Sequence, residues 1–484
     1  MGLVCVPIYI HFMGIEAYGL VGIFASLLAI FSFLDMGLST TLSREMARLA
    51  VHPEKSQEMR DLVRTLEIPY WLIGLLIAVV VILASPFIAY HWVNVKNLSS
   101  ESVRIAVMIM GLAIAFQWPL SFYSGGLIGL ERQVLLNGIN AVMATIRWGG
   151  AVLILWFVSP TVEAFFLWHT VASGINTGWV ACSLWHSLPD AAQAPRFRRK
   201  LLFNIWRFAA GVTGITVLAT ILTQLDKIIL SRMLSLEMFG YYALAYLVAI
   251  AIYSLIKPVF SAVYPQMTRL ISLNSQYELA GLYHNSAQLV SVLVLPVAFV
   301  VAFFSKEILL LWTKSPLTTE HTYVLVSILV VGTAFNGLMN IPYALQLASG
   351  WTRLAFVITL LSVLLLVPLM IMLTNWFGAT GAASVWIILN ASYVLITIPM
   401  MHRRLLPAEK WKWYCIDVGL PFGVALLVAG TFRMTLPVPI HDFALCNYIL
   451  TVLAITLMAT ALATPVTRMW IQTMVSTKRT IHGA

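Results

Sequence analysis

Residues 68–92 read IPYWLIGLLIAVVVILASPFIAYHW and contain no Asp, Glu, Lys or Arg. The hydrocarbon core of a bilayer is about 30 Å thick, and an α-helix rises about 1.5 Å per residue. A helix therefore needs about 20 consecutive apolar residues to cross it. This stretch is long enough, so it predicts a transmembrane helix and not a helix in the core of a soluble domain.

Similar apolar segments recur along the whole chain. Of its 484 residues, 60% are hydrophobic and 10% are charged, whereas about 25% are charged in a soluble domain. This composition excludes a soluble enzyme of the ordinary kind. We predict an all-α polytopic membrane protein with about fourteen transmembrane segments. The expected segments are 1–12, 18–38, 68–92, 104–129, 133–158, 163–187, 204–233, 240–264, 286–312, 321–349, 352–374, 379–401, 414–435 and 443–470.

The first segment, 1–12, is too short to cross a bilayer, because it reaches only about 18 Å as a helix. It also lacks the charged start and small-residue cleavage site of a signal peptide. We expect it to be the second part of a truncated first helix, which leaves open whether Met1 is the natural start of the protein.

The chain has a formal net charge of +10, from 29 Lys and Arg against 19 Asp and Glu. In a soluble protein such an excess would suggest nucleic-acid binding. In a membrane protein it indicates the positive-inside bias, so no nucleic-acid partner is expected. When the loop after the second segment is placed in the cytoplasm, most basic residues fall on the cytoplasmic side, and so does the C-terminus. The densest group is Arg196, Arg198, Arg199 and Lys200.

A weak internal repeat relates the two halves. Gly14–Gly19 (GIEAYG) aligns with Ser235–Gly240 (SLEMFG), and without a gap Met46–Leu49 then aligns with Met267–Leu270. Each half also has a long polar stretch, 39–67 and 265–285, expected to form an interfacial helix on the membrane. The predicted organisation is an N-terminal lobe at 1–200, a repeated lobe at 201–401, and two further helices with a cytoplasmic tail at 402–484.

Motifs for common chemistries are absent from the sequence. There is no GxxxxGK[ST] phosphate loop, no HExxH and no CxxC pair. The four cysteines are isolated from one another, and no large polar loop carries clustered carboxylates. We therefore predict no catalytic residue, no metal site and no cofactor other than a coupling H⁺ or Na⁺.

Charged residues inside the segments are the candidate functional residues, because a charge at the centre of a membrane helix costs at least about 2.5–3.5 kcal/mol. Arg147 lies near the middle of its segment, and a guanidinium there suits anion recognition, since it pairs bidentately with phosphate. Asp226 and Lys227 are adjacent and point about 100° apart on a helix, so we expect them not to pair well with each other. At least one of them should face a cavity or another helix.

Asp35 and Lys257 lie at almost matching depths in the two halves. Asp35 is either a gate or proton-coupling carboxylate, or a residue that ends its helix at the membrane surface. Lys257 could form an ion pair with Asp35 across the lobes, or extend its amine to lipid headgroups.

Several short stretches resemble a known family. Four stretches between residues 7 and 48 resemble the start of bacterial oligosaccharide flippases. These flippases are Wzx-type members of the multidrug/oligosaccharidyl-lipid/polysaccharide (MOP) exporter superfamily. The second half repeats the likeness. The stretches are Pro7–Ile10, Gly14–Gly19, Leu34–Ser39, Ser43–Arg48, Gln224–Lys227 and Phe239–Ala245.

The resemblance implies two helical lobes around a central cavity, as in MATE transporters, working by alternating access in the bacterial inner membrane. The implied substrate is an oligosaccharide linked to undecaprenyl pyrophosphate, moved from the cytoplasmic to the outer leaflet. Arg147, Lys227 and Lys257 would then bind its anionic groups, and Asp35 and Asp226 would balance charge or bind the coupling ion. Membrane lipids and a polysaccharide polymerase complex are the implied partners.

Three alternatives stay open. A drug or cation exporter of the same superfamily would need acidic cavity residues, whereas the charges here are mainly basic. A lipid II flippase would be favoured by neighbouring genes for peptidoglycan synthesis, whereas neighbouring glycosyltransferase genes would favour a surface polysaccharide. A membrane polysaccharide polymerase or glycosyltransferase would need a larger outer loop than the sequence provides.

Overall fold

The computed structural model describes residues 2–35, 37–191, 193–199, 224–439, 441–465 and 468. Their regular secondary structure is helical, apart from one isolated β-bridge between Asn94 and Ser235. Helices satisfy their own backbone hydrogen bonds, which a bilayer requires. In the described part of the chain, 10 helices are long and apolar enough to cross a membrane. The prediction of an all-α polytopic membrane protein is confirmed.

Two glycines interrupt long helices. These breaks explain part of the difference between the about fourteen segments expected from the sequence and the 10 candidate membrane helices of the described residues. Helix α1 (Gly2–Ser32) breaks at Gly14, where φ is 83°. Helix α15 (Thr352–Ser392) breaks at Gly378, where φ is 59°. Such φ values favour glycine because it has no Cβ. Each of these long helices therefore comprises two consecutive segments, as the sequence predicted.

The chain divides into two compact units, Met1–Gly240 and Tyr241–Ala484. The lobe boundary expected at 200/201 adjoins residues outside the described part, and the predicted domain organisation stays a prediction.

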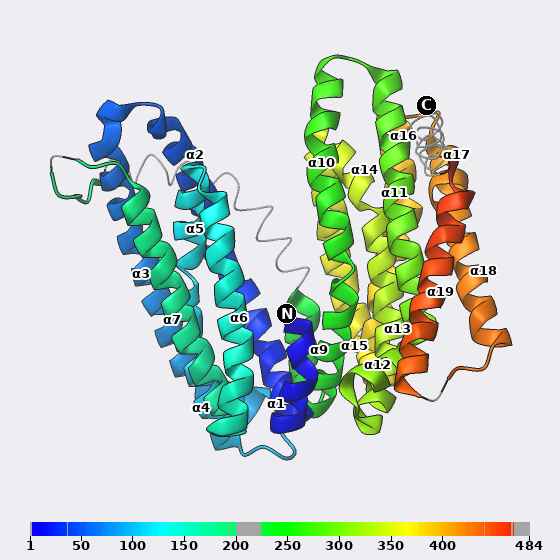
Figure 1. Cartoon of the computed structure of the whole chain (residues 1–484), viewed down its shortest axis with the longest axis horizontal. Coiled ribbons are helices and arrows are strands. Elements are labelled where there is room, and N and C mark those ends of the chain that lie inside the picture. Colours follow the sequence, from blue (N-terminus) through cyan, green and yellow to red (C-terminus); the bar gives the residue numbers. More distant parts are fainter. Residues whose placement is uncertain are drawn as a thin grey trace, which may run out of the picture. The chain divides into compact units, whose positions relative to one another are not determined.

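Unit 1 contains the helices up to the start of α9. Figure 1 shows α3, α4 and α7 packed side by side, and α2 packs against α5. The elements are α1, η1 (Phe33–Asp35), α2 (Leu38–Ala50), η2 (Pro53–Lys55), α3 (Ser56–Phe87), the π-helix η3 (Ile88–Trp92), α4 (Ser100–Gln117), α5 (Leu120–Gly129), α6 (Gln133–Phe157), α7 (Val162–Ser187) and a helical segment at 224–233.

Small residues allow α2 and α5 to approach closely. A Cβ on Gly125 would lie 2.4 Å from the carbonyl oxygen of Ser39, and one on Gly129 would lie 2.3 Å from that of Ser43. The two glycines are four residues apart and therefore share one face of α5. This small-xxx-small spacing is typical of helix contacts in membranes.

The two aligned motifs of the internal repeat contact each other within unit 1. A Cβ on Gly19 would lie 2.5 Å from the carbonyl oxygen of Leu236, and one on Gly240 would lie 2.3 Å from that of Ile15. In the repeat alignment Gly19 corresponds to Gly240 and Ile15 to Leu236, so the two contacts are reciprocal.

Unit 2 is organised around α11. In its most apolar window 67% of the residues are buried, against 11% for the window in 353–405. Helix α11 packs against α10, α13, α18 and α19 (Figure 1). The elements are α9 (Leu236–Ile250, which begins in unit 1), α10 (Tyr253–Ser272), α11 (Gln276–Phe303), α12 (Ser305–Thr313), α13 (Pro316–Leu338), α14 (Asn340–Ala348), α15, the π-helix η4 (Tyr393–Thr397), α16 (Ile398–Leu405), α17 (Lys410–Lys412), the π-helix η5 (Trp413–Gly419), α18 (Leu420–Thr435) and α19 (Asp442–Ala463).

The prediction of an interfacial helix over each of the stretches 39–67 and 265–285 was wrong in its bounds. Only α2 in the stretch 39–67 is a separate amphipathic helix, because α3 already begins at Ser56. The stretch 265–285 is the end of α10 and the start of α11, joined by a short turn. Polar residues here extend spanning helices, whose buried side chains include Leu62, Leu66 and Leu279.

Candidate functional site

Asp35 ends the first long helix of unit 1 and lies where several helices meet. It is the last residue of η1, and the chain turns into α2 through Gly37, where φ is 73°. Its Oδ2 accepts a hydrogen bond from the Ser39 hydroxyl at 2.8 Å. Its Oδ1 accepts hydrogen bonds from Tyr70 and, at 3.4 Å, from Ser121. Hydroxyl groups from α2, α3 and α5 therefore surround this carboxylate.

Tyr70 is fixed in position by aromatic neighbours. Its side chain is fully buried, with ring centroids 4.6 Å from Trp118 and 4.7 Å from Phe122. The Trp118 Nε1 in turn donates to the carbonyl oxygen of Phe31 at 3.0 Å. Because the ring is held on two sides, its hydroxyl points at Asp35 with little freedom.

A second carboxylate, Glu67, lies one turn before Tyr70 on α3 and is 8% exposed. Its Oε1 accepts hydrogen bonds from the Tyr123 hydroxyl at 2.6 Å and from Trp185 Nε1 at 3.3 Å. Its Oε2 accepts one from Arg64 at 2.8 Å. Sequence reasoning missed Glu67 because it assigned residues 39–67 to the membrane surface. Its spacing of three residues from Tyr70 was the available signal.

Arg147 lies on α6 with a buried Nε that has no hydrogen-bond partner among the described residues. No carboxylate in that part of the chain forms an ion pair with it. The nearby His169, 5% exposed, also has an unpartnered Nε2 and lies edge-on to Trp148, with ring centroids 5.6 Å apart. Buried polar groups are almost always hydrogen-bonded, so a buried Nε without a partner is unusual. The guanidinium of Arg147 is therefore able to bind an anion.

Lys227 and Asp226 lie on the helical segment 224–233 and form an ion pair. The Nζ of Lys227 is 3.1 Å from Oδ1 and 3.3 Å from Oδ2 of Asp226. The expectation that adjacent residues would not pair was wrong, because the long lysine chain bends across the angle between the two positions. The side chain of Lys227 is 10% exposed, and its charge is balanced locally.

Lys257 lies on α10 beside Pro258 and is exposed. Among the described residues it has no hydrogen-bond or ion-pair partner. Asp35 belongs to unit 1 and Lys257 to unit 2, so the predicted pair between them stays a prediction.

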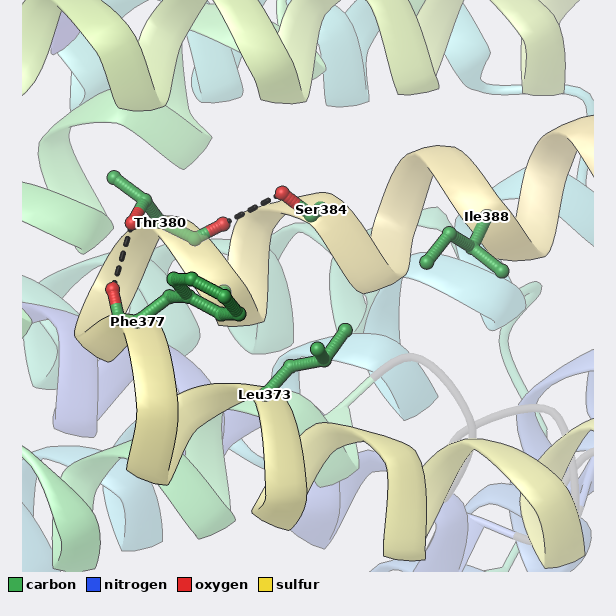
Figure 2. Close-up of a pocket in the computed structure, with 6 residues that line it drawn as sticks. Leu373, Phe377, Thr380, Ser384 and Ile388 are labelled. Atoms are coloured by element: carbon green, nitrogen blue, oxygen red, sulfur yellow. Dashed lines mark hydrogen bonds between the residues drawn. The ribbon is translucent and has the colours of Figure 1, made fainter.

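The break in α15 opens a pocket of about 370 Å³ in unit 2. Figure 2 shows Leu373, Phe377 and Ile388 around it, while Thr380 and Ser384 donate their hydroxyls to backbone carbonyls at 2.6 and 2.8 Å. Gly381 completes the lining. Because no charged residue lines it, this pocket does not suit a phosphate. The described residues also contain no cluster of three or more His, Cys, Asp or Glu that could hold a metal ion.

Comparison with known proteins identifies the family. A family model described as "Polysaccharide biosynthesis protein" matches residues 1–271. The chain belongs to this family. It is also 20% identical over 375 residues to a protein of Shigella flexneri named "Putative O-antigen transporter", covering 77% of this chain and 87% of that protein.

Solved structures show the same fold for this member of the polysaccharide biosynthesis family. A lipid II flippase MurJ in an inward closed conformation has a TM-score of 0.71 at 15% identity, covering 95% of each chain. An inward-facing MATE family transporter of the MOP superfamily has a TM-score of 0.68 at 14% identity, covering 84% of this chain and 94% of that one. The resemblance to oligosaccharide flippases of the MOP superfamily is confirmed, as is the MATE-like fold. The fold is therefore shared with a lipid II flippase and a MATE family transporter, and the chain is a multi-pass membrane protein.

Proposed function

We propose that this protein is a flippase that moves an undecaprenyl-pyrophosphate-linked oligosaccharide across the bacterial inner membrane by alternating access. The direction is from the cytoplasmic to the periplasmic leaflet, for the synthesis of a surface polysaccharide. The observation that carries the proposal is Arg147, a guanidinium in an apolar helix with a buried, unpartnered Nε. A pyrophosphate supplies the oxygens that this group lacks. The O-antigen transporter relative supports the class of substrate.

The other charged residues take different roles in this proposal. Lys257 is exposed and attracts the anionic headgroup. Lys227, which the sequence assigned to the same task, works only together with Asp226, since the two form an ion pair. Asp35 binds the coupling H⁺ or Na⁺, because its neighbours are hydroxyls that can donate to a carboxylate or turn their oxygens toward a cation.

The charges argue against export of cationic drugs. Asp226 is engaged by Lys227, and of the five candidate residues the one with a buried, unpartnered side-chain atom is a cation, Arg147. A cationic substrate would be repelled by such a group. The C-terminus is proposed to lie in the cytoplasm, and a polysaccharide polymerase is a proposed partner at the membrane.

The test replaces Arg147 with Ala and measures surface polysaccharide at equal protein abundance, in a strain that depends on this protein. A hydrogen bond to a charged group contributes about 1.5–3 kcal/mol, so polymer output should fall about tenfold or more. Arg147→Lys should restore little, because lysine cannot form the bidentate contact. Arg132→Ala is the matched control, since Arg132 is exposed at the start of α6.

Unchanged polymer output in Arg147→Ala would remove Arg147 from the mechanism. Restoration of peptidoglycan synthesis in a strain lacking its lipid II flippase, without any effect on surface polysaccharide, would instead assign lipid II as the substrate.

A further inference from the structure

Unit 2 contains a buried polar cluster that sequence reasoning missed. His284 on α11 is 2% exposed and Asp417 on η5 is fully buried. The His284 Nδ1 contacts Oδ2 of Asp417, and its Nε2 lies 2.8 Å from Oε2 of Glu409. Gln288, one turn along α11, donates to the other oxygen of Asp417 at 2.8 Å. The imidazole ring therefore lies between two carboxyl groups.

This arrangement requires an additional proton. A neutral imidazole has one N–H and one bare nitrogen, and carboxylates accept but do not donate. A neutral ring between two carboxylates would place a bare nitrogen against an oxygen. Both contacts are satisfied only if His284 is an imidazolium or if one of the carboxyl groups is protonated. In either form the three groups hold one proton more than neutral histidine between two carboxylates.

The groups around the cluster favour this proton. Lys412 lies 3.7 Å from Glu409 and its side chain is 47% exposed, so its charge is largely solvated. Tyr283 is close to His402 Nε2 at 3.4 Å, and His402 Nδ1 lies 3.0 Å from the carbonyl oxygen of Ile398. His402 thus donates from Nδ1 and accepts at Nε2, which is the neutral form of the ring. The carboxylates of Asp417 and Glu409 outweigh the one exposed cation.

The cluster opens toward solvent at one end only. Among its side chains Asp417 is 0% exposed, His284 is 3% exposed and Glu409 is 27% exposed. Asp417 also lies in a π-helix, a geometry that is rare in proteins and frequent at functional sites. A proton can therefore enter and leave through Glu409, while Asp417 holds its inner end.

We propose that His284, Asp417 and Glu409 form a proton-binding site that joins α11 to the C-terminal helices. When loaded, it carries one net negative charge and ties η5 and Glu409 to α11. On release, the N–H bond at Nε2 breaks, Glu409 takes the proton and passes it to water, and the cluster gains a second negative charge. The bare Nε2 then faces the Glu409 carboxylate, which weakens the contact between α11 and Glu409, while the Nδ1–H of His284 keeps its contact with Asp417. Its use in transport rests on the proposed flippase function, but the site itself does not.

Nuclear magnetic resonance of the full-length protein in lipid nanodiscs tests the site directly. The protein is labelled with ¹⁵N-histidine, and His284→Gln identifies the signals of that ring by their loss. At pH 7.5 the expected wild-type spectrum shows two protonated ring nitrogens for His284. In Glu409→Gln the ring should become neutral. The control His441→Gln, at an exposed residue outside the cluster, should leave the His284 signals unchanged.

Infrared spectroscopy detects the alternative state of the site, in which Asp417 or Glu409 carries the proton. A carboxylic-acid band that is present in the wild type and lost in Asp417→Asn or Glu409→Gln would also support the site. A neutral His284 ring at pH 6.5 without such a band would overturn it.

Transport is measured separately as surface polysaccharide in Glu409→Gln, with Glu320→Gln, at an exposed residue of α13, as the control. Loss of output in Glu409→Gln alone is expected. Imidazolium signals combined with an absence of any transport activity in the wild type would refute the flippase function and leave the proton site intact. Normal output in Glu409→Gln would show that the site plays no part in transport.

Discussion

At the scale of single residues, Asp35 differs from an ordinary helix-ending carboxylate in the number and rigidity of its donors. Ser39, Tyr70 and Ser121 come from three different helices, so their hydroxyls meet only in the folded chain. A carboxylate held by hydroxyls, without a cation among the described residues, is able to bind a small cation, because the hydroxyl oxygens can turn toward it. This is the physical basis of the coupling role proposed for it.

Tyr70→Phe tests that role. The substitution removes one hydroxyl and keeps the ring between Trp118 and Phe122, so the free energy of unfolding should fall by only about 0.5–1.5 kcal/mol. Transport should fall more strongly, because Asp35 loses a donor. Thermal unfolding and surface polysaccharide are the measurements. Tyr18→Phe is the control, as Tyr18 is also buried and its hydroxyl has no partner among the described residues. Equal effects of the two variants would contradict the role.

The sequence predicted charged residues in the spans but not their partners. Arg147 was identified from its position alone, and its role in binding stays a prediction. Glu67 and Asp417 were missed because each lies near an expected segment end, where a carboxylate usually faces water. The distance between a charged side chain and its partner depends on how the helices pack, and a local sequence pattern does not predict that packing.

At the scale of elements, the contact between α2 and α5 depends on two glycines. Ser39 and Ser43 on α2 place their carbonyl oxygens where the side chains of residues 125 and 129 would otherwise lie. Since α2 follows Asp35 directly and α5 carries Ser121, this contact also determines how the hydroxyls reach the carboxylate.

Gly129→Ala should separate α2 from α5, because the added Cβ would lie 2.3 Å from a backbone oxygen that cannot rotate away. Overpacking of this kind costs about 1–3 kcal/mol in the free energy of unfolding. The matched control is Gly138→Ala on α6, where a Cβ meets nothing within 4 Å. That variant should be neutral or slightly stabilising, since alanine favours helices. Thermal unfolding in detergent compares the two, and equal midpoints would exclude the close contact.

Helix positions and the two glycine breaks followed from the apolar runs in the sequence, whereas the π-helices did not. The breaks near Gly14 and Gly378 were expected within a few residues, because polar and small residues separate the apolar runs there. The π-helices η3, η4 and η5 left no recognisable pattern. A π-helical turn adds only one residue to an α-helix, and this changes the apolar periodicity too little to be recognised in a single sequence.

At the scale of the whole molecule, composition and the distribution of basic residues determined the class and the expected orientation. The apolar content required a polytopic membrane protein, and the structure has that architecture. The orientation stays a prediction, because a fold is the same in either direction across a bilayer.

Cysteine accessibility tests the orientation. In a variant lacking the four native cysteines, Glu54→Cys in η2 and Pro160→Cys between α6 and α7 are exposed positions on opposite predicted sides. A membrane-impermeant maleimide should label residue 160 in intact spheroplasts and residue 54 only after lysis, because basic loops face the cytoplasm. Function of the cysteine-free variant is the control. The reverse labelling pattern would invert the topology and with it the proposed direction of transport.

The reciprocal contacts of Gly19 with Leu236 and of Gly240 with Ile15 have an evolutionary consequence. When two identical subunits pair about a twofold axis, each contact occurs twice: residue i of one subunit contacts residue j of the other, and residue j of the first contacts residue i of the second. Here both copies belong to one chain. A half-length ancestor that paired with itself through this glycine face, followed by gene duplication and fusion, would leave such an arrangement. In such a chain each copy is free to diverge, so that one half can carry Arg147 and the other His284 without either change being imposed on both.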